Sequence, residues 1–162
     1  MNYLAHLYLS FDDPQISVGN FMADFVKGKR YNDYPTSIKN GILIHREIDS
    51  YTDSHPIQLQ GKRRLSEEYR HYAGVIMDIY YDHFLAKNWA EYSDTDLATF
   101  CDQQYQLLNA HHEVLPERCR YFLGYMEAGN WLLNYQNLEG IQFALSGLSR
   151  RTKFRSGMEK AV

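Results

Sequence analysis

The sequence predicts an all-α fold, a single-domain bundle of about seven helices. Apolar residues recur at helical spacing along nearly the whole chain, and prolines and capping residues divide it into segments of helix length. No pair of alternating apolar runs joined by a hairpin turn is present. With 162 residues, 44% of them hydrophobic, the chain is long enough to bury a sizeable core. We therefore expect residues 1–162 to form one helical domain.

Start signals define the helices expected in the first half of the chain. The opening segment MNYLAHLYLS fits either a strand or a short helix. Asp13 is placed to cap a helix that has Pro14 at its first position and Gly28 as its stop. The further helices expected here run from Pro35 to about His55, from Pro56 onward, and from about Ala73 through VIMDIYYDHFLAKNW.

The second half shows similar signals. Ser93, with an acid three residues later at Asp96, forms a helix-start signature. Pro116 opens a helix that is expected to continue through Leu132, and a last helix runs roughly from Leu138 to Leu148. A basic tail at about residues 149–162 follows, and it begins with a cluster of Arg150, Arg151, Lys153 and Arg155.

Several functional classes are excluded by what the sequence lacks. It has no GxxxxGK[ST] phosphate loop, no GxGxxG fingerprint and no GxSxG nucleophile elbow. No apolar run approaches the roughly 20 residues of a membrane span, and the N-terminus lacks the features of a signal peptide. Cys101 and Cys119 stand outside any CxxC pattern, so we expect buried, reduced cysteines in a cytoplasmic protein. Neither membrane insertion nor nucleic-acid binding is expected, and the oligomeric state is left open.

Two groups of acids and histidines carry the functional signal. His45, Asp49 and Asp53 recur at every fourth residue of one expected helix, and a later helix holds Asp78, Asp82 and His83. Residues four apart lie on one helix face. Carboxylates packed closely inside a protein repel one another unless a cation or protons neutralise them. Mixed His and Asp groups suit Mn²⁺, Fe or Zn better than Ca²⁺, so we expect a divalent transition-metal site.

Individual members leave alternatives open. Asp24 is flanked by apolar residues and is either on the solvent-facing side of a helix or a buried ligand; Asn20 shares its face. His45 and Asp49 form either a hydrogen-bonded pair or two metal ligands, and the neighbouring Arg46 is suited to neutralise a carboxylate or hold a phosphate oxygen. Asp78 interrupts the most apolar stretch of the chain and therefore needs a partner or a cation. His6 could reach the same centre.

Four ordered blocks carry a resemblance to a known family. MNYLAHLYLS, SVGNFMADFVKG, GILIHREIDSYTDSHP and MDIYYDHFLAKNW together resemble the acyl carrier protein phosphodiesterases. The resemblance implies an all-helical, HD-domain-like fold and a divalent cation, usually Mn²⁺, with Mg²⁺, Fe²⁺ or Co²⁺ as alternatives. It implies hydrolysis of the phosphodiester that joins 4′-phosphopantetheine to a serine of holo-acyl carrier protein, giving the apo form.

The resemblance also implies which residues act. It places metal ligands among Asp24, His45, Asp49, Asp78 and Asp82, and catalytic groups among Asp24, Asp82, His83 and Arg46. The chain has no adjacent His-Asp pair of the HD type, since Asp82-His83 has the reverse order, so the ligand set stays open.

Acyl carrier proteins are strongly acidic, which makes the basic tail a plausible docking surface. We expect Arg150, Arg151, Lys153 and Arg155 to contact the carrier. Two rival interpretations remain: a related hydrolase that acts on a nucleotide or another small phosphoester, and a non-catalytic helical module that binds an acidic carrier protein.

Overall fold

The computed structural model describes residues 1–152 and 156–162, without the side chain of Arg151. In this part of the chain all regular elements are helical and no strand occurs, which confirms the all-α prediction. The α-helices are α1 (Tyr3–Tyr8), α2 (Pro14–Met22), α3 (Thr36–Ser54), α4 (Pro56–Tyr69), α5 (Ala73–Lys87), α6 (Leu97–Ala110), α7 (Glu117–Ala128), α8 (Trp131–Asn134) and α9 (Leu138–Arg151). Short 3-10 helices cover Ala23–Phe25, Arg30–Asp33, Arg70–Tyr72, Trp89–Glu91, His112–Val114 and Met158–Lys160.

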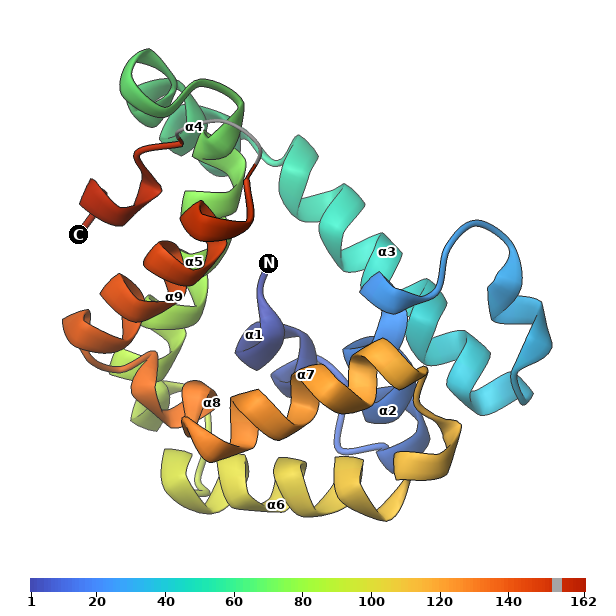
Figure 1. The fold of residues 1–162 in the computed structure, drawn as a ribbon. Helices are drawn as coiled ribbons and strands as arrows, with labels where there is room; N and C mark the ends of the chain where they lie inside the picture. The colour runs from blue at the N-terminus through green and yellow to red at the C-terminus, as the bar shows by residue number, and fades with distance from the viewer. Residues whose placement is uncertain (153–155) are drawn as a thin grey trace.

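The helices surround the N-terminal segment (Figure 1). α3 forms one side, α5 and α9 pack together on the other, and α6 and α7 run across the base. The short helix α1 lies between these walls and contacts both α2 and α5. Within the described residues, no helix has the length and apolar character that crossing a bilayer requires.

Capping chemistry explains most helix starts. Asp13 accepts hydrogen bonds from the amides of Gln15 and Ile16, and Pro14 occupies the first turn of α2, as predicted. α6 is capped by Asp96, whose side chain accepts from the amide of Thr99, so this helix begins after Asp96 rather than at Ser93. The opening segment is a short helix rather than a strand.

Two expected helices are shorter than their apolar pattern suggested. The helix expected to reach Gly28 ends as α2 at Met22 and tightens into the 3-10 turn Ala23–Phe25. The helix expected through Leu132 stops as α7 at Ala128, because Asn130 adopts a left-handed conformation with φ of 43° before α8 begins. The first break presents Asp24 on an irregular turn.

The predicted basic tail is in part an ordered element. α9 continues past Leu148 to Arg151, and the segment after the undescribed residues packs back onto the protein. Met158 and Ala161 are buried, and the hydroxyl of Tyr80 donates to the carbonyl of Ala161 at 2.7 Å. Of the basic residues expected there, Arg150 is described and exposed, whereas Lys153, Arg155 and the side chain of Arg151 lie outside the described part.

Two glycines set the closest contact between helices α2 and α3. A Cβ added at Gly41 would collide with the carbonyl of Ile16 and lie 2.9 Å from the Cα of Gly19. A Cβ at Gly19 would meet the backbone of Ile38 in the same way. Backbones can approach this closely only without side chains, so these glycines fix the crossing of α2 and α3.

Gly41→Ala should lower the free energy of unfolding by about 1–3 kcal/mol, the usual cost of overpacking, because backbone atoms cannot move aside as side chains do. Urea denaturation followed by circular dichroism measures this change. Gly124→Ala is the matched control, because its added Cβ meets nothing within 4 Å. Its free energy of unfolding should be unchanged or slightly higher, since alanine favours the helical conformation of α7. Equal stability of the two variants would contradict the packing argument.

Candidate functional site

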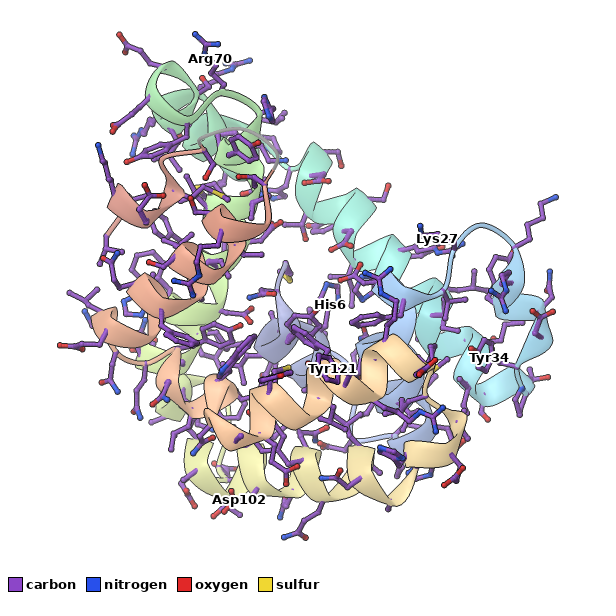
Figure 2. The ribbon with its side chains drawn as sticks, in the orientation of Figure 1. His6, Lys27, Tyr34, Arg70, Asp102 and Tyr121 are labelled. Carbon is purple, nitrogen blue, oxygen red and sulfur yellow. The ribbon has the colours of Figure 1, made fainter. Side chains whose placement is uncertain are left out.

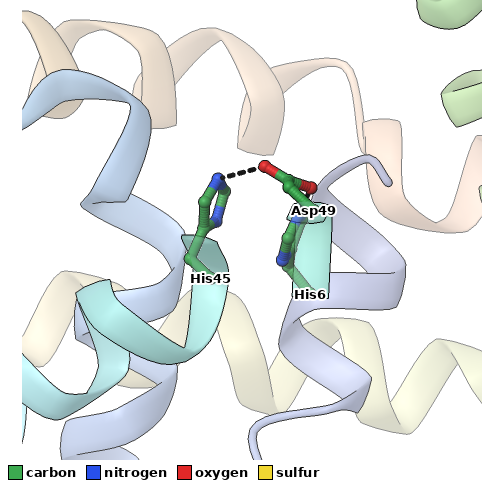
Figure 3. Close-up of side chains that lie close together, drawn as sticks. All are labelled: His6, His45 and Asp49. Atoms are coloured by element: carbon green, nitrogen blue, oxygen red, sulfur yellow. Dashed lines mark hydrogen bonds and ion pairs between the residues drawn. The ribbon is translucent and has the colours of Figure 1, made fainter. Parts of the chain in front are cut away.

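A compact group of ligand-type side chains lies where α1 meets α3. His6 on α1 and His45 and Asp49 on α3 each offer one ligand atom, and these atoms lie within 4.8 Å of one another. His45 Nε2 is 3.2 Å from Asp49 Oδ2, and His6 Nε2 is 3.1 Å from Asp49 Oδ1 (Figure 3). The two imidazole rings stack with centroids 3.8 Å apart. Both histidines are buried, whereas Asp49 is half-buried.

Asn20 on α2 determines how His45 is oriented. The Nδ1 atom of His45 is 2.9 Å from the Asn20 carbonyl, so Nδ1 carries the proton and donates it. The Asn20 side chain in turn donates to the carbonyl of His6 at 2.7 Å and to the Ser10 hydroxyl at 3.1 Å. This fully buried asparagine therefore ties together the segments that carry the two histidines.

Asp24 completes the edge of this group. Its Oδ1 atom lies 3.3 Å from His45 Nε2, and 60% of its side chain is exposed. Asp24 therefore faces solvent, which is the first of the two alternatives that the sequence left open, and it also contacts the buried histidine. It comes from the irregular turn after α2, which allows the side chain to reach toward α3.

The pKa values in this group are strongly shifted. Burial alone would lower the pKa of His45, but hydrogen bonds to Asp24 and Asp49 outweigh burial and raise the pKa to about 9. A hydrogen bond from His45 lowers the pKa of Asp24. Burial alone would raise the pKa of Asp49, yet hydrogen bonds from His45 and His6 hold it far below its usual range. Burial lowers the pKa of His6. A positive charge at His45 Nε2 is thus strongly favoured.

These residues fit a divalent cation. With Nδ1 of His45 committed to Asn20, a neutral ring would point its Nε2 lone pair at the carboxylates of Asp24 and Asp49. That arrangement is repulsive unless a proton or a cation lies between the three groups. Two imidazole nitrogens with carboxylate oxygens form a donor set suited to divalent transition metals, and the second nitrogen of His45 has the backbone partner typical of such ligands.

Asp78 lies beside the group rather than within it. Its Oδ1 atom is 3.1 Å from the Met1 amino group, which also contacts Asp49 Oδ1 at 3.2 Å. Gln58, which is fully buried, approaches the same oxygen at 3.5 Å. Burial raises the pKa of Asp78, although the Met1 ammonium partly offsets this effect. Asp78 and Asp49 therefore share the Met1 ammonium group, and Asp78 forms no ion pair with His45.

The structure brings Asp82 to a different place from the one expected. Its side chain is completely buried, and its two oxygens accept hydrogen bonds from the amides of Leu4 at 2.7 Å and Ala5 at 3.1 Å. These are the otherwise unpaired amides at the start of α1. Burial raises the pKa of Asp82 to about 7, against the effect of those amides. Asp82 anchors the helix that carries His6, and it is not positioned as a ligand in this structure.

His83 and Arg46 also point away from the group. His83 lies on a different face of α5 from Asp82. Its ring therefore forms a hydrogen bond through Nδ1 to the carbonyl of Tyr135 at 2.7 Å. Arg46 donates to the carbonyl of Val26 at 2.9 Å and lies 5.0 Å from the centre of the Tyr31 ring. Asp53, the third member of the sequence pattern, pairs with Lys62 at 2.6 Å near the surface.

Two residues contribute more than their sequence context indicates. His6, expected only to be within reach of the centre, is one of the buried imidazoles of the group. Asn20, expected to share a face with Asp24, orients His45. Both lie in short apolar segments with weak periodicity, and the only available signal was a polar residue among apolar neighbours.

A cleft of about 1150 Å³ opens beside the group. Asp24 and Asp78 line one part of it, and helices α5, α7 and α9 supply much of the remainder. Arg118 and Arg150 also border the cleft. The ligand group therefore lies at the edge of a space large enough for a substrate rather than in a closed core.

Comparison with known proteins places this chain in a family. The family model described as acyl carrier protein phosphodiesterase matches residues 1–162. A relative of that name from Photorhabdus laumondii is 36% identical over 152 residues, covering 93% of this chain and 77% of the relative. The relative from Pectobacterium atrosepticum is 36% identical, and the one from Escherichia coli O6:H1 is 33% identical; each match covers 93% of this chain and 79% of the relative.

No solved structure matches the chain, so the HD-like relationship stays a prediction. The resemblance seen in four sequence blocks is confirmed over the full length. The chain belongs to the acyl carrier protein phosphodiesterase family.

Proposed function

We propose that this protein hydrolyses the phosphodiester of holo-acyl carrier protein and releases apo-carrier and 4′-phosphopantetheine. The relatives that cover most of the chain are named for action on acyl carrier protein. The observation that carries the proposal is the contact of His45 Nε2 with two carboxylates, from Asp24 and Asp49, beside an open cleft. Such a group is suited to hold a cation where an anionic phosphodiester can reach it.

The cation is proposed to be divalent, with Mn²⁺ first and Mg²⁺, Fe²⁺ or Co²⁺ as alternatives. His6, His45 and Asp49 would hold it, with Asp24 at the exposed edge. When bound, it offsets charge on the phosphoryl oxygens and makes water more acidic. Asp78, paired with the Met1 amino group, is proposed to act in the electrostatics of the site rather than as a direct ligand.

The residues of the chain supply orientation and a proton acceptor. Asn20 holds the ring of His45 so that Nε2 faces the carboxylates of Asp24 and Asp49. Asp24, ionised and exposed, is proposed to orient the attacking water and take its proton. The water oxygen bonds to phosphorus, the bond from phosphorus to the serine oxygen breaks, and that oxygen takes up the proton that Asp24 accepted from water. Asp82 and His83 are proposed to support the fold and not the reaction.

The carrier is proposed to dock on the basic side of the cleft. Arg150 is exposed and borders the cleft, and the undescribed residues Lys153 and Arg155 follow it closely in sequence. Complementary charges at a rim steer an acidic partner into register. The two buried cysteines carry free thiols, which suits the reducing cytoplasm expected for this protein.

Incubation of holo-carrier with the protein and Mn²⁺ should remove the mass of the prosthetic group, as measured by intact-protein mass spectrometry. His45→Gln should reduce kcat/KM by more than about 100-fold, because replacing a ligand costs at least as much as losing an outer partner. His112→Gln, an exposed histidine outside the site, is the control. Cleavage of nucleotides but not holo-carrier would favour the rival hydrolase, and carrier binding that survives EDTA without cleavage would favour the binding module.

Binding of Mn²⁺ at pH 7 should release about one proton, because His45, with a pKa of about 9, must lose its proton to act as a ligand. His6, with a lowered pKa, is already neutral. Affinity should therefore rise with pH up to about 9. Calorimetric titration in two buffers of different ionisation enthalpy measures the proton.

The metal-free protein should show the opposite trend with pH. Because folding raises the pKa of His45 from 6.5 to about 9, its protonation stabilises the folded state. This stabilisation is complete below pH 6.5 and is lost as the pH rises through 9. Urea denaturation in EDTA should detect this loss, and His45→Gln should remove it. Equal heats of Mn²⁺ binding in both buffers, or a stability independent of pH in this range, would contradict the assigned charge of His45.

Arg150→Glu should raise KM for holo-carrier about fivefold, the effect of roughly 1 kcal/mol for an exposed charge pair, with kcat unchanged. Hydrolysis of the small diester bis(4-nitrophenyl) phosphate should not change, because it carries no acidic protein. Lys87→Glu, an exposed cation outside the cleft lining, is the matched control. The same loss with both substrates would show that Arg150 acts on chemistry rather than docking.

A further inference from the structure

Four aromatic rings form a continuous row that begins next to Asp24. Phe25 follows Asp24 in sequence, and its ring centre lies 5.7 Å from that of Phe122 on α7. Phe122 lies 5.5 Å from Trp131, and Trp131 lies 5.9 Å from Phe143 on α9. All four rings line the cleft. The row therefore extends from Asp24 along the lining of the cleft.

The far part of the row is left uncovered. The side chain of Phe143 is 55% exposed, although an aromatic ring of this size is normally buried. Tyr121, which projects from α7 (Figure 2), and Tyr125 also line the cleft and are 69% and 54% exposed, with their hydroxyls 2.7 Å apart. The surface combines apolar ring faces with hydroxyl groups, so it suits a ligand that alternates methylene and amide groups.

The chemistry changes from one end of the cleft to the other. Asp24 and Asp78 lie at the end beside the histidine group, where a cation and a phosphodiester would meet. The exposed arginines Arg118 and Arg150 also border the cleft and complement an acidic protein. The volume of about 1150 Å³ far exceeds what a phosphate group needs and reaches the upper range of small-molecule sites.

We propose that the uncharged pantetheine arm lies along the row Phe25, Phe122, Trp131 and Phe143 while its phosphodiester is held at the histidine group. The proposal rests on the proposed function and adds the residues that select for the arm. Phe143, remote from the histidines in the row, contributes to binding of the arm and not to chemistry at phosphorus. Tyr121 and Tyr125 offer hydroxyls to its amide groups.

The experiment compares Phe143→Ala with Phe84→Ala. Phe84 is 54% exposed and lies outside the cleft lining, so the two replacements remove equally exposed rings. The dissociation constants of 4′-phosphopantetheine and of inorganic phosphate are measured by calorimetry with Mn²⁺ present. Phe143→Ala should weaken phosphopantetheine binding about tenfold, since covering one aromatic side chain is worth roughly that factor, and leave phosphate binding unchanged. Phe84→Ala should change neither.

A second readout uses tryptophan fluorescence. Phosphopantetheine should alter the emission of the wild-type protein, and Trp131→Phe should abolish the change while keeping a ring in the row. The other tryptophan, Trp89, is buried and outside the cleft lining. KM for holo-carrier should rise in Phe143→Ala with kcat retained.

The outcomes separate this proposal from the proposed function. If the wild type cleaves holo-carrier and Phe143→Ala leaves the dissociation constant of phosphopantetheine unchanged, the placement of the arm is overturned and the proposed function remains. Equal weakening of phosphate and phosphopantetheine would also overturn it, because the ring would then act through the phosphate site. Failure of the wild type to cleave holo-carrier, with specific phosphopantetheine binding still lost in Phe143→Ala, would overturn the function and retain the arm site.

Discussion

The close crossing of α2 and α3 is the constraint on which the site depends. Gly19 and Gly41 allow the two backbones to meet, and the next residue of α2, Asn20, then lies against His45, one helical turn after Gly41. A side chain at either glycine would separate these helices. The imidazole would lose the carbonyl that fixes its tautomer, and its other nitrogen would no longer be aimed at the carboxylates of Asp24 and Asp49. The packing of α2 against α3 thus determines the direction in which Nε2 of His45 points.

A second constraint comes from a carboxylate that sequence reasoning assigned to chemistry. Asp82 is completely buried, and it survives there because two amides at the start of α1 donate to it. α1 has only six residues, too few to be stable alone, so its position depends on such anchoring and on packing against its neighbours. In this structure Asp82 therefore holds in place the helix that carries His6.

The sequence predicted the helical class and most helix starts, and its spacing brought His45 and Asp49 to one helix face, because these depend on local signals such as caps, prolines and residue spacing. It could not separate Asp78 and Asp82 by environment, because residues on one helix face differ in what the opposing elements bring to them. Asp82 meets the amides of α1, whereas Asp78 meets Gln58 and the Met1 amino group. The contribution of His6 was equally hidden, since it requires a contact between α1 and α3 that no local pattern encodes.

The positions of the proposed ligands along the chain also have a consequence for folding. His6 belongs to the first turns of the chain, whereas His45 and Asp49 belong to a helix far along it. An ion gripped by both would act as a cross-link across that long loop, and its binding energy would add to the energy of folding. Metal supply would then influence how much of the newly made polypeptide reaches its native form, as well as how fast the finished protein works.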